Sequence, residues 1–153
     1  MLLSTAIMAI PALCVVVFVV VRYRRERNED LEQYSMTAEA LYALRQVNQE
    51  LLIFDVRQPL DLLAYPEIIP SARRIAPDDL VANPSLIPRD KDAVVYCTCP
   101  SDKTSREISR RALALRFLRV KYLKGGLEAW KMNGYPVEPY KESFHLYTSA
   151  SSR

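Results

Sequence analysis

The sequence contains few cysteines, few histidines and little excess charge. Its three cysteines, Cys14, Cys97 and Cys99, do not make the disulfide framework that is typical of a small secreted domain. A metal site is disfavoured, because Cys97 and Cys99 supply only two thiols and the sole histidine, His145, lies in the C-terminal tail. The formal net charge of +3 gives no reason to expect nucleic acid as a partner.

Charged residues are absent from positions 2–21. Twenty residues at the rise of an α-helix span about 30 Å, the thickness of the apolar core of a bilayer. We therefore expect a transmembrane anchor helix over residues 2–21, in which Pro11 is tolerated. A cleaved signal peptide is the competing interpretation. The lack of a basic segment before the apolar run, and of a small-residue cleavage site before Arg22, favours the uncleaved anchor.

Basic residues follow the apolar run directly, at Arg22, Arg24, Arg25 and Arg27. The positive-inside rule then predicts a single-pass membrane protein whose amino terminus is outside and whose remaining chain is cytoplasmic. We expect a prokaryotic inner membrane, with the lipid bilayer as one partner. Acidic residues soon neutralise the basic cluster, so residues 22–33 are interpreted as a charged juxtamembrane stalk. Residues 141–153 are polar and are interpreted as a flexible C-terminal tail.

Helix and strand patterns alternate over residues 34–140. The sequence predicts helices at 38–48, at 58–64, from Pro77 onward, at 104–117 and at 127–132, and strands at 51–54, 72–75, 93–96 and 120–123. Short connections between alternating elements predict an α/β domain with a largely parallel central sheet flanked by helices, preceded by the one transmembrane helix. Ligands of such sheets bind at the carboxyl ends of the strands.

Two of the predicted helices carry apolar residues at helical spacing, which indicates the side that packs on the sheet. Thr37 is a suitable N-cap for the first of these helices. The apolar positions are Leu41, Leu44 and Val47 in the first helix, and Ile108, Ala112 and Leu115 in the other.

The stretch from Ala93 to Glu107 combines a strand, a cysteine, a polar loop and a helix start. Its sequence is AVVYCTCPSDKTSRE, in which Cys97 directly follows the predicted strand. Thr104 and Ser105 suit the N-terminal boundary of the next helix. Loop amides and the positive end of the helix dipole would converge on the sulfur, which favours a thiolate or a sulfur-bound anion.

Several short motifs of this chain, in their order and spacing, resemble a rhodanese-like (thiosulfate sulfurtransferase) domain over about residues 34–140. The most specific motif is the closing block with Gly125, Gly126, Trp130, Gly134, Tyr135 and Pro136. The other motifs are MTAEAL, LLIFDVRQP, IIPSARRI and VVYC with its loop. Trp130 is interpreted as a core residue, and Asp55 and Arg57 as a structural ion pair or cap near the site.

The resemblance implies sulfurtransferase chemistry without a metal or an organic cofactor. A cysteine thiolate would take sulfur from a small donor, thiosulfate or a persulfide, carry it as a persulfide, and pass it to an unknown thiol or protein acceptor. Cys97 matches the nucleophile of the family by strand register. Lys103 is the candidate for binding an anionic donor, with a solvent-exposed loop charge as the alternative. The loop residues Thr98, Ser101, Thr104 and Ser105 complete the candidate substrate-binding set.

The loop departs from the usual family pattern. It contains neither the glycine nor the arginine of the common form, and it carries Pro100 and Asp102 instead. Proline removes one amide donor, and Asp102 is expected to oppose an anionic donor. The loop is about two residues longer when counted from Cys97, whereas counting from Cys99 restores the usual length. We favour Cys97 as the nucleophile and keep Cys99 as the alternative.

Other functions remain open on these residues. Cys99 could act as a redox partner that resolves a persulfide or sulfenate on Cys97. A phosphatase or arsenate reductase is disfavoured, because Lys103 stands where such a loop needs an arginine for bidentate contact with an oxyanion. The second functional class is a catalytically weak rhodanese-fold binding, regulatory or thiol-redox module that is tethered to the membrane.

Overall fold

The structure is a computed structural model that describes residues 14–22, 31–98, 102–117 and 119–141. The chain divides into two compact units, Met1–Gln33 and Tyr34–Arg153. In the first unit, residues 14–22 form a helix with exposed side chains. Within the described residues, no helix has both the length and the apolar character needed to cross a membrane. Positions 2–13 of the predicted anchor, most of the predicted stalk and tail residues 142–153 lie outside the described residues.

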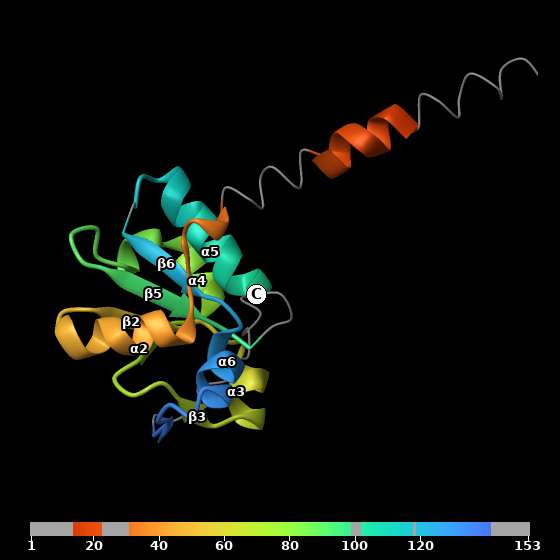
Figure 1. Cartoon of the computed structure of the whole chain (residues 1–153). Helices are drawn as coiled ribbons and strands as arrows, with labels where there is room; N and C mark the ends of the chain where they lie inside the picture. Colours follow the sequence, from red (N-terminus) through yellow and green to blue (C-terminus); the bar gives the residue numbers. More distant parts are fainter. Residues whose placement is uncertain (1–13, 23–30, 99–101, 118, 142–153) are drawn as a thin grey trace, which may run out of the picture. The chain divides into compact units, whose positions relative to one another are not determined.

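Five strands of the second unit form one parallel sheet with the order β1-β6-β5-β2-β4 (Figure 1). Their bounds are β1 (Ser35–Met36), β2 (Leu52–Asp55), β4 (Arg73–Arg74), β5 (Ala93–Tyr96) and β6 (Val120–Leu123). The central strand β5 pairs in parallel with both β2 and β6, and all four of its residues are buried. A continuous apolar run is what a strand covered on both faces requires. The predicted α/β class and its parallel sheet are confirmed.

Helices cover both faces of this sheet, and the alternation of side chains along the strands divides the core in two. On one face, α4 (Pro77–Ala82) and α5 (Lys103–Ala114) pack in one core cluster with the side chains of Phe54, Val95 and Cys97, and the 3₁₀ turn η1 (Pro84–Leu86) follows α4. On the other face, α2 (Ala38–Val47) and α6 (Gly126–Met132) meet Val94 and Tyr96. Helix α3 (Pro59–Ala64) follows β2.

A small antiparallel sheet pairs β3 (Glu67–Ile68) with β7 (Glu138–Pro139). Next to β7 in the chain, the closing block packs around Trp130, whose side chain is fully buried and whose Nε1 donates a hydrogen bond to the carbonyl of Pro136 (2.7 Å). The ring of Tyr135 stacks on that of Tyr42 with centroids 4.3 Å apart. The interpretation of Trp130 as a core residue is confirmed.

Two apolar positions and one helix end were predicted wrongly. Val47 is 81% exposed and Leu115 is 48% exposed. Val47 is the last residue of α2 and Leu115 is the C-cap of α5, so the apolar spacing extends to helix ends that no longer face the core. Helix α5 spans Lys103–Ala114, so Thr104 and Ser105 lie inside its first turn, and residues 115–117 of the predicted helix lie beyond its end. The predicted cap of α2 is confirmed, since Thr37 Oγ1 accepts a hydrogen bond from the amide of Ala40 (3.3 Å).

Candidate active site at the end of the central strand

Cys97 lies directly after β5, at the carboxyl end of the central strand. Its side chain is only 1% exposed. Its side chain belongs to the core on the α5 face of the sheet, which also contains Val56 and Ile108. This orientation follows from the alternation along the strand, because Cys97 faces the same way as Val95. The alternative nucleophile Cys99, and Ser101 of the candidate binding set, lie outside the described residues.

The start of the loop between β5 and α5 is fixed by the first residues of α6. The carbonyl of Cys97 accepts a hydrogen bond from the amide of Leu127 (3.2 Å). Gly126 permits this approach, since a Cβ at that position would lie 1.9 Å from the carbonyl oxygen of Cys97. Its φ of +52° also lies in the left-handed region that glycine adopts without strain. A glycine is therefore required here for two separate reasons.

The end of the same loop is held by the same turn. Asp102 is 8% exposed, and its Oδ2 accepts a hydrogen bond from the amide of Gly125 (2.8 Å). Its φ of +54° is left-handed, a conformation that aspartate tolerates better than most residues. The expectation that Asp102 opposes an anionic donor stays a prediction, and in the structure this carboxylate also attaches the loop to the turn at Gly125. Cys97 and Asp102 are thus both bonded to one three-residue segment, Gly125–Leu127.

The first turn of α5 places the predicted binding residues in different environments. Lys103 is exposed, Thr104 is partly buried and Ser105 is fully buried. The hydroxyls of Ser105 and of Ser109, one turn further along, have no hydrogen-bond partner among the described residues. A buried hydroxyl without a partner is costly, so Ser105 is available to a group that enters next to it. Ser109 was not singled out from the sequence.

Asp55 and Arg57 form the ion pair expected of them, with both side chains fully buried. Arg57 Nε and Nη2 donate to the Asp55 carboxylate at 2.9 and 2.5 Å. The remaining donors bond the carbonyls of Tyr65 (2.8 Å) and Glu67 (2.7 Å). Arg57 therefore fixes the segment after α3.

Tyr96 completes this buried polar network. Its hydroxyl donates to Asp55 Oδ2 (3.0 Å) and accepts a hydrogen bond from the amide of Ile69 (3.2 Å). Burial raises the pKa of Tyr96 far above its usual value, and the negative charge of Asp55 raises this pKa further. The hydroxyl stays protonated and serves as a structural donor one residue before Cys97.

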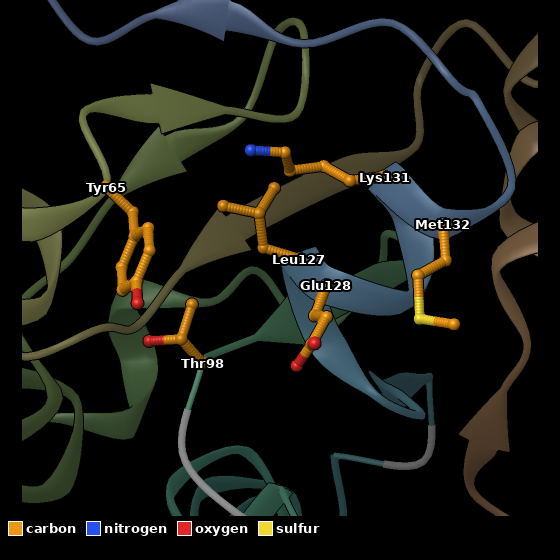
Figure 2. A pocket seen from close by; sticks show the side chains of 6 residues that line it. All are labelled: Tyr65, Thr98, Leu127, Glu128, Lys131 and Met132. Carbon is orange, nitrogen blue, oxygen red and sulfur yellow. The ribbon is translucent and has the colours of Figure 1, made fainter.

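A pocket of about 450 Å³ lies beside the loop on the α6 side (Figure 2). Its lining residues are Tyr65, Thr98, Leu127, Glu128, Lys131 and Met132. Of the described members of the predicted binding set, only Thr98 is in this lining. The other described members, Lys103, Thr104 and Ser105, begin α5. No cluster of three or more potential metal ligands occurs in the described parts of the chain.

Comparison with known proteins gives a consistent family. The family model described as a rhodanese-like domain matches residues 37–133. A sulfurtransferase of Allochromatium vinosum is 29% identical over 89 residues, which cover 58% of this chain and 79% of that protein. A rhodanese-related protein from Thermoplasma volcanium has a TM-score of 0.57 at 26% identity, covering 68% of this chain and 96% of that one. The thiosulfate sulfurtransferase of Pseudomonas aeruginosa resembles the fold, with a TM-score of 0.59 at 23% identity over 70% of this chain and 20% of that one.

Proposed function

Because this chain belongs to the rhodanese-like domain family, we propose that it is a sulfurtransferase that carries sulfane sulfur as a persulfide on Cys97. The observation that carries the proposal is the position of this thiol at the end of the central strand, in a loop whose two ends are bonded to Gly125–Leu127. The name of the Allochromatium vinosum relative supports the same reaction class.

The proposed reaction has two displacement steps. The Cys97 thiolate attacks the outer sulfur of thiosulfate, a new S–S bond forms, and the S–S bond of the donor breaks to release sulfite. With an organic persulfide as the donor, the leaving group is the corresponding thiolate. In the second step an acceptor thiolate attacks the outer sulfur, forms its own S–S bond and releases the Cys97 thiolate. Neither step requires an external oxidant or reductant.

The start of α5 supports this chemistry. Helix α5 has twelve residues, so its N-terminus carries the positive end of a substantial dipole. The buried hydroxyl of Ser105, which has no partner among the described residues, would donate to the terminal sulfur or to the thiolate. Lys103, exposed at the first position of α5, would attract an anionic donor from solvent.

We also propose that residues 2–21 anchor the protein in a membrane, with the domain on the cytoplasmic side and the lipid bilayer as a partner. The support is the uncharged run and the arginines that follow it. The full chain should stay with membranes through an alkaline carbonate wash, and detergent should release it. Release by carbonate would contradict the anchor.

A tethered binding module is the second candidate. The burial of Cys97 to 1% exposure favours it, because a carrier sulfur must become accessible to its donor. Transfer of sulfur from thiosulfate or an organic persulfide to a thiol separates the two functions. We expect turnover by the full chain in detergent and its loss in Cys97→Ser, with Cys99→Ser retaining turnover. Loss in Cys99→Ser alone would move the nucleophile to Cys99, and no turnover with either donor would favour the binding module.

A further inference from the structure

Helix α5 carries a row of basic side chains on the side that faces away from the sheet. The side that meets the sheet is marked by its buried residues, Ser105, Ile108, Ser109 and Ala112. Lys103, Arg106 and Arg110 follow one another at intervals of three and four residues, so they form a row along the other side of the helix. Arg111 and Arg116 are exposed and continue this row to the end of the helix. These five residues are called the basic face below.

The positive charge of the domain is concentrated on the basic face. Residues 103–116 contain five basic residues and one acidic residue, Glu107, which gives a net charge of +4. The rest of residues 34–153 contains twelve basic and thirteen acidic residues, a net charge of −1. Glu107 pairs with both Arg110 and Arg111, so one carboxylate is shared by two guanidinium groups. A local excess of this kind attracts an anionic partner.

The neighbouring elements determine how far the basic face extends. Helix α5 packs over β6, where the Cζ atom of Arg106 lies 5.6 Å from the centroid of the Tyr122 ring (Figure 1). Helix α4 also packs against α5, but it follows β4 at the far edge of the sheet, and its first turn contains the acidic residues Asp78 and Asp79. The positive charge therefore continues toward the β6 side of the domain and ends at α4.

The chain enters the domain on the β6 side. Strand β1 pairs with β6, and the amide of Tyr122 donates a hydrogen bond to the carbonyl of Tyr34 (2.9 Å). Residues 22–33 separate Tyr34 from the predicted membrane span, a connection that covers about 40 Å at full extension. A tether of this length keeps the domain close to the lipid headgroups, so that even a weak attraction to them is sufficient for contact.

An exposed apolar side chain lies at the end of the row. Leu115 is 48% exposed and stands between Arg111 and Arg116 in the sequence. Basic residues combined with exposed apolar ones are typical of helices that lie on anionic bilayers, where the apolar side chain enters the boundary between headgroups and acyl chains. The exposure of Leu115 and the short tether favour a lipid surface over an acidic protein as the partner.

We propose that the basic face of α5 docks on a bilayer that contains anionic lipid, with the arginines on lipid phosphate groups and Leu115 at the headgroup boundary. The inference rests on the proposed membrane anchor and does not depend on sulfur transfer. In the docked state α5 lies along the membrane surface, and the orientation of the domain on the membrane is fixed.

The test uses the full chain in nanodiscs in which some lipid headgroups carry a gadolinium chelate. The metal broadens the resonances of nearby amides and so reports which face of the domain lies on the bilayer. In discs of phosphatidylcholine with phosphatidylglycerol, we expect stronger broadening for the amides of α5 than for those of α2, which covers the other face of the sheet. Omission of phosphatidylglycerol, or added salt, should remove most of this difference.

A double variant, Arg110→Gln with Arg116→Gln, removes two charges from the basic face. We expect it to reduce the phosphatidylglycerol-dependent broadening of α5 at least about fivefold. Arg73→Gln with Lys131→Gln is the matched control, because it removes the same charge from exposed positions on β4 and α6. This control should leave the broadening of α5 unchanged.

The outcomes separate the docking from the anchor. Association with phosphatidylcholine discs, combined with equal broadening of α5 in both lipid compositions or equal effects of the two double variants, upholds the anchor and overturns the docking. Binding only to discs with phosphatidylglycerol, through α5, upholds the docking and overturns the anchor, whereas binding to neither disc overturns both. Shifts of the α5 amides with soluble polyglutamate, without a response to phosphatidylglycerol, overturn the lipid assignment in favour of an acidic protein.

Discussion

Arg57 joins three segments of the chain through one buried guanidinium. It pairs with Asp55 and bonds the carbonyls of Tyr65 and Glu67, while Tyr96 approaches the same carboxylate from β5. Removing one member of a buried pair leaves the other charged and without compensation. The network therefore determines where the wall of the pocket lies as well as how stable the domain is.

Replacing Arg57 should be far more costly than replacing an arginine of a surface ion pair. We expect Arg57→Met to lower the free energy of unfolding by about 3–5 kcal/mol, measured by urea denaturation. Arg110→Met is the control, because Arg110 pairs with Glu107 at a partly exposed site and should change stability by about 0.5 kcal/mol or less. Equal losses in the two variants would contradict a structural role for the buried pair.

Tyr96 should make the domain sensitive to alkali. Its pKa is raised in the folded protein, so its contribution to stability is complete below the pKa of the unfolded chain, near 10, and is lost as the pH rises above that value. The free energy of unfolding of the wild type should therefore fall between about pH 9 and pH 11. Tyr96→Phe, although less stable at pH 7, should show a shallower fall over this interval. Parallel curves would contradict the raised pKa.

At the scale of elements, the turn between β6 and α6 organises the site. Gly126 allows its segment to approach Cys97, Leu127 bonds the Cys97 carbonyl, and Gly125 bonds the carboxylate of Asp102. The loop between β5 and α5 is thereby attached at both ends to a segment more than twenty residues further along the chain. The turn acts on the sulfur site through backbone contacts.

Alanine at Gly126 should displace the end of β5, because the new Cβ would overlap the Cys97 carbonyl. We expect Gly126→Ala to lower the free energy of unfolding by about 2–4 kcal/mol and to reduce sulfur transfer in the remaining folded protein. Gly134→Ala is a matched control, since Gly134 also has a left-handed φ, of +72°, but has open space around it. That variant should lose only about 1 kcal/mol. The reverse order would show that the contact with Cys97 is unimportant.

Substitutions at Asp102 can distinguish the contribution of its hydrogen bond from that of its left-handed backbone conformation. Asp102→Asn keeps an oxygen that can accept from Gly125 and tolerates the left-handed φ, so it should change stability by about 0.5 kcal/mol or less. Asp102→Gly loses only the acceptor, and Asp102→Ala loses both features. In a Cys14→Ser, Cys99→Ser background, the reaction of Cys97 with a thiol reagent should be accelerated least by Asp102→Asn, more by Asp102→Gly and most by Asp102→Ala. An Asn variant that behaves like the Ala variant would contradict the attachment at Gly125.

At the scale of the whole molecule, local patterns predicted the main elements but not the contacts between them. The strands β5 and β6 were predicted at their observed bounds, because short runs rich in β-branched and aromatic residues, bounded by loop residues, favour a strand. The two-residue strands β1, β3 and β7 are too short to carry a pattern. The bond from Gly125 to Asp102 and the pocket at Thr98 depend on tertiary packing between distant segments, which no local spacing reveals.

The positions of Cys97 and of the Asp55–Arg57 ion pair were predictable from the sequence. Cys97 directly follows β5 and Asp55 ends β2, and these two strands are parallel neighbours, so both residues lie at the same edge of the sheet. The burial of the Cys97 side chain was not predictable, since it depends on how α5 packs over the end of β5. Two sheet faces thus perform different tasks in this molecule. One encloses the thiol against α5, and the other presents the pocket beside α6.

Intact mass spectrometry of the full chain after incubation with an organic persulfide would show whether Cys97 carries sulfane sulfur. We predict a gain of one sulfur atom that a reducing thiol removes, that persists in Cys99→Ser and in Cys14→Ser, and that is absent in Cys97→Ser. No gain in any folded sample with free thiols would contradict the carrier role. A gain that disappears only in Cys99→Ser would contradict the assignment to Cys97.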